Sequence, residues 1–333
     1  MAMPTKSIRL FYVVLAGLLS STPAGAEWLR EVQSKMGTQV TVTFWNEDAS
    51  QAGIERGREL MRLSMAEFDR IENAMSTYIA DTEMWNINAY AADHPVKVSA
   101  ELMQLLQRAL QLSETTSGAF DITYDSVGHL YDYRNSVRPD ANTIDDHLDR
   151  VNYRHVQLDM ERNTVQFLHP GVRINLGGIA KGYSVERVIA LLDEQGVAHA
   201  SATAGGDTRI LGDRRGVPWI IGIRHPDESD GIVTRLPIID EAVSTSGDYE
   251  RFFIEDGARY HHILDPASGL PTEGLRSVTV LGPDGTMTDG LSTSVFVLGV
   301  SAGLHQIESM PAYEAVIIDG QGQLHYSNGL SGR

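Results

Sequence analysis

Glycines, a lysine, hydroxyls, carboxylates and histidines recur in four segments whose spacing suits phosphate or metal chemistry. In residues 174–183, Gly177, Gly178 and Lys181 stand directly before a predicted helix. Glycines let a ligand approach the backbone, and the amides at a helix N-terminus favour phosphate. Lys181 would add a point charge to a pyrophosphate. A plain strand-to-helix turn with a solvated lysine explains the segment nearly as well, and the glycines lack the spacing of the dinucleotide-binding fingerprint.

A carboxylate and two hydroxyls fall on one predicted helical face in residues 288–293. Asp289 and Thr293 are four positions apart, and Ser292 lies beside them. An oxygen-only set suits Mg²⁺ or Ca²⁺, and a small set suits Mg²⁺ completed by phosphates and water. The alternative is a helix N-cap formed by Thr288 or Asp289 without any metal. For this segment alone, capping is the better explanation.

The other two segments contain a glycine pair and a histidine pair. Gly205 and Gly206 precede Asp207, which indicates a backbone pressed against a ligand or merely a tight turn. His261 and His262 are neighbours on a predicted strand, so their side chains should face opposite sides. One histidine would face a cleft as a base or donor, and the other would meet solvent. The alternative is a purely structural role, which is the more common one for a lone histidine on a strand.

The elements that must position these groups are a mixture of helices and strands. Helical spacing or capping predicts helices over residues 51–75, after an N-cap at Ser99, over 184–195 and over about 289–297. β-Branched and aromatic runs predict strands over residues 40–45, 156–158, 164–167, 219–223, 241–244, 251–254 and 277–281. The polar segment 139–149 is expected to be a loop between two lobes. This order favours an α+β fold over a doubly wound sheet.

The N-terminus has the three parts of a secretory signal peptide, predicted to cover residues 1–26. Lys6 and Arg9 precede an apolar run over residues 10–19, and small residues at 24–26 form a cleavage site. The run is shorter than the about 20 residues that span a bilayer. We therefore expect a soluble periplasmic protein consisting of residues 27–333. No cysteine follows the run, which excludes a lipid anchor attached through cysteine.

The composition excludes several classes of function. The formal net charge is −17, which disfavours nonspecific binding to nucleic acid or anionic lipid. The absence of cysteine rules out thiol catalysis and disulfides, and it fits an oxidising compartment. Any nucleotide that binds will need local donors or a metal to offset its phosphates.

Five segments in this order resemble the ApbE family, the FAD:protein FMN transferases. They are residues 175–183, 204–207, 244–251, 262–269 and 288–293, with further likeness at 36–38, 75–78 and 118–121. The resemblance covers essentially the whole chain after the predicted signal peptide. It has two departures. Asn175 stands where many members carry aspartate, which removes a charge, and Ala202 and Thr203 replace the usual Asn-Ala pair.

The resemblance implies a T-fold-like α+β structure, with antiparallel sheets backed by helices and FAD in a cleft. It implies that His262 is the general base. It implies a metal site formed by Gly178 through its carbonyl, Asp289, Ser292 and Thr293, with Mg²⁺ as the cofactor and Ca²⁺ or Mn²⁺ as alternatives. The residues implied to contact FAD are Met36, Tyr78, Ala119, Phe120, Asp121, Asn175, Lys181 and Ile263.

The implied reaction moves FMN from FAD to a threonine hydroxyl of another protein through a phosphoester bond, and AMP leaves. The acceptor threonine would lie in a motif of the form D-(G/A)-x-(S/T)-(G/A)-(A/S)-T, on a membrane redox subunit. One alternative is an FAD pyrophosphatase, in which water replaces threonine. Another is a non-catalytic periplasmic FAD-binding protein, which would not need the metal set together with His262.

Overall fold

An antiparallel sheet forms the centre of the computed structural model, which describes residues 26–228 and 231–330. The predicted signal peptide lies outside these residues, apart from its last position. Within the described part of the chain the sheet has eight strands in the order β1-β2-β6-β7-β10-β13-β14-β15. They are β1 (Glu27–Lys35), β2 (Thr38–Asn46), β6 (Ala200–Ala204), β7 (Asp207–Leu211), β10 (Ala242–Gly247), β13 (Leu275–Gly282), β14 (Glu314–Asp319) and β15 (Leu324–Tyr326).

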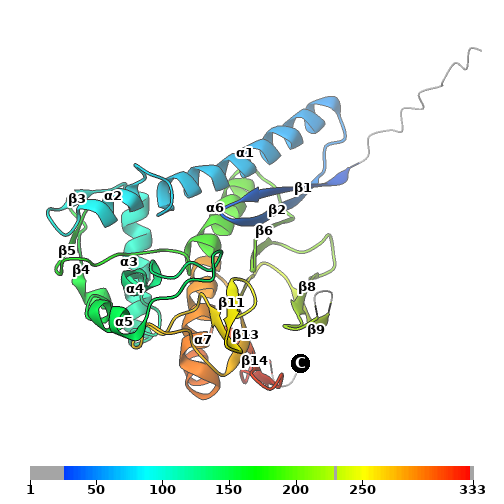
Figure 1. Ribbon diagram of the computed structural model, residues 1–333. Coiled ribbons are helices and arrows are strands. Elements are labelled where there is room, and N and C mark those ends of the chain that lie inside the picture. Colours follow the sequence, from blue (N-terminus) through cyan, green and yellow to red (C-terminus); the bar gives the residue numbers. More distant parts are fainter. Residues whose placement is uncertain (1–25, 229–230, 331–333) are drawn as a thin grey trace, which may run out of the picture.

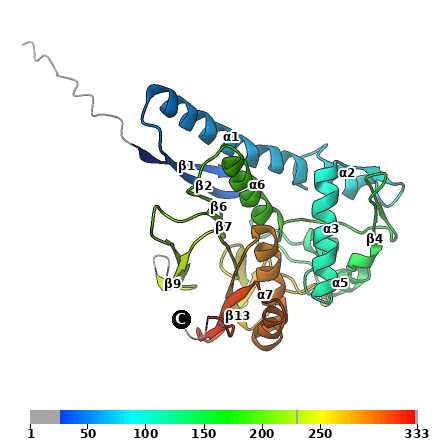
Figure 2. The same ribbon diagram turned by 180° about the vertical axis from the view of Figure 1, so that it is seen from behind.

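Three long helices pack along one face of this sheet (Figures 1 and 2). They are α1 (Gln51–Met75), α6 (Ala180–Glu194) and α7 (Gly285–Glu308). Because strand residues alternate between faces, Val278 and Ile317 point into the core shared with α7. Leu281 and Ile318 point to the opposite face, where a hairpin formed by β8 (Trp219–Arg224) and β9 (Ile232–Ile238) packs on them.

A smaller group of helices and a three-stranded sheet lies on one side of α6 and α7, and the β8–β9 hairpin lies on the other side (Figures 1 and 2). The helices are α2 (Glu83–Tyr90), α3 (Ala100–Thr115), η1 (Ile122–Tyr124), α4 (Asp125–Gly128), α5 (Ala141–Leu148) and η2 (Tyr153–His155). The small sheet has the order β3-β5-β4 and consists of β3 (Val96–Lys97), β4 (Val156–Asp159) and β5 (Thr164–Phe167). A separate hairpin joins β11 (Phe252–Glu255) to β12 (Ala258–His261).

The structure confirms the α+β class and most of the predicted elements. Ser99 caps α3, as predicted, by accepting a hydrogen bond from the amide of Leu102 at 3.2 Å. The loop predicted at 139–149 is wrong, because Asp140 caps α5 there by accepting from the amide of Thr143 at 2.8 Å. The division into two lobes stays a prediction.

Helix α7 is apolar enough and long enough to cross a membrane by composition alone, the one helix of the described residues with that property. Its inner side is buried against β10 and β13, which is typical of the core helix of a folded domain. The helix contains residue 299, a glycine with φ of 77° that bends the chain.

Candidate active site

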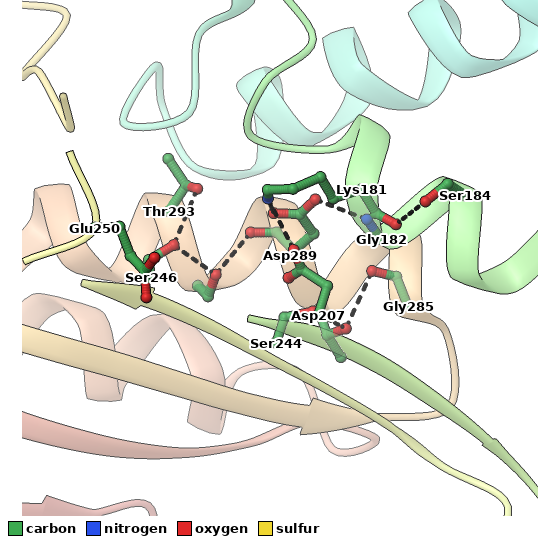
Figure 3. Close-up of polar contacts among 12 residues, drawn as sticks. Lys181, Gly182, Ser184, Asp207, Ser244, Ser246, Glu250, Gly285, Asp289 and Thr293 are labelled. Atoms are coloured by element: carbon green, nitrogen blue, oxygen red, sulfur yellow. Dashed lines mark hydrogen bonds and ion pairs between the residues drawn. The ribbon is translucent and has the colours of Figure 1, made fainter. Parts of the chain in front are cut away.

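The first turns of α6 and α7 meet at a glycine that permits an unusually close approach. A side chain on Gly182 would place its Cβ 2.0 Å from the carbonyl oxygen of Gly285 and 2.6 Å from the Cβ of Asp289. The amide of Gly182 donates a hydrogen bond to Oδ2 of Asp289 at 2.9 Å (Figure 3). Glycine at this position therefore fixes α6 against the carboxylate of α7.

Two buried carboxylates share one lysine at this junction. Nζ of Lys181 lies 2.8 Å from Asp207 and 3.6 Å from Asp289 (Figure 3). Burial and the charge of Asp207 raise the pKa of Asp289, and Lys181 opposes this shift. Burial acts to lower the pKa of Lys181, but the two carboxylates outweigh it and raise that pKa. Lys181 is therefore positively charged. When both carboxylates are ionised, the cluster of the three side chains carries a net negative charge.

Hydroxyl groups continue from this cluster along α7. Oγ of Ser246, on β10, lies 2.8 Å from Oγ of Ser292 and 3.3 Å from Oγ1 of Thr293 (Figure 3). A side chain on Gly178 would lie 3.2 Å from Oγ1 of Thr293. The structure thus brings together the four residues expected to bind metal, with Gly178 beside Thr293 and Asp289 one turn before it.

Capping by Thr288 or Asp289, the alternative from the sequence, is wrong. Helix α7 begins a turn earlier, where Asp284 accepts from the amide of Met287 at 2.9 Å. The hydroxyl of Thr288 instead lies 3.1 Å from the carbonyl oxygen of Gly285 and 2.9 Å from the hydroxyl of Ser244. The carboxylate of Asp289 therefore does not cap α7, and it faces Lys181 and the amide of Gly182 instead.

His262 directly follows β12, and its amide donates to the carbonyl of Arg251 at 3.1 Å. Its Nδ1 is buried and has no hydrogen-bond partner within residues 26–228 and 231–330. Burial, followed by the charges of Arg251, His261 and Lys181, lowers the pKa of His262 to about 3. The ring is neutral at pH 7 and can accept a proton.

His261 is buried, so the expectation that the second histidine meets solvent is wrong. Its Nε2 lies 2.8 Å from the carbonyl oxygen of Thr272, and its ring packs edge-on against Phe296. Burial lowers the pKa of His261. The two histidines therefore differ in environment, because His261 is buried and His262 is only partly buried.

The residues expected to contact FAD fall into an exposed group and a buried group. Tyr78 is 86% exposed, so its ring is free to stack on a ligand, and Met36 lines a surface cavity of about 450 Å³. Phe120 is buried and would lie 3.3 Å from a side chain on Gly178. Ala119 is only partly buried and precedes it, and Ile263 is buried in the same core.

Asp121 and Asn175 make contacts within the protein that explain their residue types. Both oxygens of Asp121 are occupied, one by the amide of Thr123 and the other by the amide of Tyr153, each at 2.8 Å. The side-chain amide of Asn175 donates to Asp125 at 3.2 Å, and its oxygen accepts from the amide of Gly177 at 2.8 Å. An aspartate at 175 would oppose the carboxylate of Asp125, so asparagine suits this neighbour.

For three site residues the sequence predicted no role of the side chain. Asp207 follows the glycine pair 205–206, a segment whose turn explained it equally well. Ser246 and Arg251 lie within residues 244–251, where the likeness to the family gave no role to either. Their positions depend on the pairing of β10 with β7 and on the close packing of α7, which spacing along the chain does not reveal.

The fold and the site define an α+β enzyme whose buried lysine, carboxylates and hydroxyls suit phosphate chemistry. The ApbE family model matches residues 36–317, and the chain belongs to the ApbE family.

Relatives and solved structures agree over most of the chain. The FAD:protein FMN transferase of Vibrio cholerae is 32% identical over 307 residues, which cover 91% of each chain. The protein of that name from Klebsiella pneumoniae is 32% identical over 287 residues, 85% of this chain and 86% of the relative. The ApbE protein of Thermotoga maritima superposes with a TM-score of 0.83 at 31% identity, covering 91% of this chain and 98% of that one. The flavin transferase ApbE of Vibrio cholerae gives 0.81 at 28% identity, over 92% and 99%.

Proposed function

We propose that this enzyme transfers FMN from FAD to a threonine hydroxyl of another protein, with release of AMP and with the help of a divalent metal. Membership of the ApbE family and relatives that are FAD:protein FMN transferases support the flavin-transferase activity. The observation that carries the chemistry is the cluster of Lys181, Asp207 and Asp289 beside hydroxyls of α7. Phosphoryl transfer depends mostly on positioning and on charge neutralisation, which such a cluster provides.

The oxygen donors fit Mg²⁺ better than a softer metal. The described residues contain no group of three or more histidine, cysteine, aspartate or glutamate side chains that could hold a metal. One carboxylate, two hydroxyls and a backbone carbonyl are a small hard set, which Mg²⁺ would complete with phosphate oxygens and water. Asp207 and Asp289 share a single lysine, so a cation would offset the remaining charge. Asp289, Ser292, Thr293 and the carbonyl of Gly178 would hold it.

The reaction forms one phosphoester bond and breaks one phosphoanhydride bond. The threonine oxygen of the acceptor attacks the FMN phosphorus of FAD, the bond from that phosphorus to the AMP oxygen breaks, and AMP leaves. Bound Mg²⁺ would act as a Lewis acid on the pyrophosphate oxygens. Lys181 adds a positive charge at the pyrophosphate, and His262 takes the proton of the threonine hydroxyl.

The low pKa of His262 is consistent with the role of a base whose pKa rises when an anion binds beside it. A base works best with a pKa near the operating pH, well above about 3. An anionic pyrophosphate near Lys181 and Arg251 would offset the charges that help lower that pKa. Binding of FAD is therefore expected to raise the pKa of His262 and make it a stronger base.

The acceptor and the compartment are the remaining parts of the proposal. We propose an acceptor threonine in the motif D-(G/A)-x-(S/T)-(G/A)-(A/S)-T of a membrane redox subunit, and export to the periplasm with cleavage after residue 26. N-terminal sequencing of the exported protein should begin at Glu27. A chain that retains Met1 would contradict the export proposal.

Product analysis separates a transferase from an FAD pyrophosphatase. Purified protein is incubated with FAD and Mg²⁺, with and without a candidate subunit that carries the acceptor motif, and AMP and free FMN are quantified by chromatography. A transferase releases AMP in step with loss of the acceptor hydroxyl and yields little free FMN. Equal amounts of AMP and free FMN, independent of the acceptor, would identify a pyrophosphatase. A protein that binds FAD without consuming it would be a carrier.

A further inference from the structure

Arg251 stands in the connection between β10 and β11, and its backbone is fixed at both ends. At the start of the connection, buried Asp248 pairs with Arg259 at 3.2 Å and with Arg276 at 3.0 Å. At its end, the carbonyl of Arg251 accepts from the amide of His262 at 3.1 Å. The segment is therefore anchored, and the backbone of Arg251 is held beside His262, the proposed base.

The guanidinium of Arg251 reaches the turn between β1 and β2. A side chain on Gly37 would lie 3.4 Å from Nη2 of Arg251, and Gly37 lines the same surface cavity as Met36. Glycine at position 37, with φ of 69°, suits the tight turn and leaves room for the guanidinium. The arginine thus lies between the cavity and His262.

Arg251 has no side-chain hydrogen bond or ion pair with any of the residues that the structure describes. This contrasts with Arg259 and Arg276, which both pair with Asp248. The charge of Arg251 acts on groups that come from three other segments, because it helps to lower the pKa of His262 and opposes the raised pKa of Lys181 and of Tyr124. Arg251 is exposed, and its charge acts on a lysine and a histidine, so its guanidinium is available to an anion that binds near them.

We propose that Arg251 binds the pyrophosphate of FAD, as a second cation beside Lys181. The identity of the anion rests on the proposed function, whereas the unpaired guanidinium is a feature of the protein alone. Arginine offers a planar fork of donors that suits phosphate oxygens, while lysine offers a point charge. Arg251 is therefore a determinant of specificity for phosphorylated flavin over free riboflavin.

The test compares a flavin that carries phosphate with one that does not. Dissociation constants for FAD and riboflavin are measured by flavin fluorescence on the full mature chain, for wild type, Arg251→Gln and Arg251→Lys. Arg62→Gln is the matched control, because Arg62 is an exposed arginine of α1 whose one ion pair among the described residues is with Glu59, three residues away. Melting temperatures confirm that each variant is folded.

We expect Arg251→Gln to weaken FAD binding by about 10- to 100-fold, as for the loss of a charged hydrogen bond of about 1.5–3 kcal/mol. Riboflavin affinity should stay unchanged, Arg251→Lys should recover part of the loss, and Arg62→Gln should behave as wild type. Unchanged FAD affinity in Arg251→Gln, or equal loss for both flavins, would overturn the proposal. These binding results stand even if wild type fails to transfer FMN, which would refute the proposed function and leave the anion site tested.

Discussion

At the scale of single residues, the two adjacent histidines are enclosed by different parts of the protein. His262 contributes a buried Nδ1 that has no hydrogen-bond partner in the described part of the chain, and the charges of Arg251 and Lys181 act on the ring. His261 is held by the carbonyl of Thr272 and by the ring of Phe296. Alternation along a strand predicted that the side chains diverge, but not that His261 would be buried, because burial depends on which elements pack on each face.

Alanine at each position should therefore give opposite phenotypes. His262→Ala should lose about 10²- to 10⁴-fold in FMN transfer rate and keep FAD affinity, because it removes the base and leaves the binding surface. His261→Ala should keep the rate per folded molecule and lose stability by about 1–3 kcal/mol, because it removes a buried ring and leaves the partly buried carbonyl of Thr272 without its donor. Transfer rate, FAD affinity and denaturant unfolding of both variants test this. Loss of FAD binding in His262→Ala would assign that residue to the ligand pocket instead.

The low pKa of His262 also predicts how stability depends on pH. The folded-state pKa of about 3 lies below the ordinary histidine value of 6.5, so between these values the unfolded chain binds the extra proton. The stability that comes from a neutral His262 is complete above pH 6.5 and is lost as the pH falls toward 3. The free energy of unfolding of ligand-free wild type should fall more steeply across this range than that of His262→Gln. Parallel curves for the two proteins would contradict the assigned pKa.

Removal of a proposed metal ligand should abolish the response to Mg²⁺. Asp289→Asn should lose FMN transfer, and adding Mg²⁺ after EDTA treatment should not restore it. Asp149→Asn changes a largely exposed aspartate, so its FMN transfer should recover fully when Mg²⁺ is added after EDTA. Ser246→Ala should weaken Mg²⁺ binding about 10- to 100-fold, because Ser246 orients the hydroxyls of Ser292 and Thr293. Titration calorimetry with Mg²⁺ measures this without turnover. Wild-type activity that persists in EDTA would exclude the metal.

At the scale of the elements, the site depends on the crossing of α6 and α7. Gly182→Ala should force the helices apart, because its Cβ would meet the carbonyl of Gly285 at 2.0 Å, and should therefore lower both stability and the Mg²⁺ response. Gly299→Ala is the comparison, because its Cβ meets nothing within 4 Å and only the backbone φ of 77° is strained. That variant should lose about 1–3 kcal/mol of stability and keep its Mg²⁺ affinity. Equal effects on Mg²⁺ affinity would mean that the crossing does not position the ligands.

Local signals in the sequence predicted a helix well where an N-cap residue or a clear apolar period marks it. Ser99 and the apolar spacing of residues 51–75 are examples. The segment 139–149 was expected to be a loop because it is polar, but Asp140 caps a helix whose one buried residue is Ile144. A short helix with a single buried residue has almost no apolar period, so spacing along the chain cannot reveal it.

The start of α7 shows why part of the site was also beyond the sequence. Both Asp284 and Asp289 could cap a helix, and the choice is made by packing against α6, through Gly182. The set of Gly178, Asp289, Ser292 and Thr293 followed from likeness to a family, and the structure brings these residues together. Asp207 joined the cluster only through the pairing of distant strands.

At the scale of the whole molecule, the central sheet unites segments far apart in the chain around one site. Strands β7 and β10 supply Asp207 and Ser246, while α6 and α7 supply Lys181 and Asp289. The exposed Tyr78 comes from the chain between α1 and α2, and Gly37 from the turn between β1 and β2. A site assembled from so many segments forms only in the complete fold, so its activity reports on the integrity of the whole protein.

The most direct test of the central claim is the mass of an acceptor protein after incubation with this enzyme, FAD and Mg²⁺. Intact-protein and peptide mass spectrometry should find one FMN attached through phosphate to the threonine of the acceptor motif. The adduct should be absent when that threonine is replaced by valine, and it should form about 10²- to 10⁴-fold more slowly when the enzyme is His262→Ala. An acceptor that remains unmodified while FAD is hydrolysed to AMP and free FMN would contradict the claim.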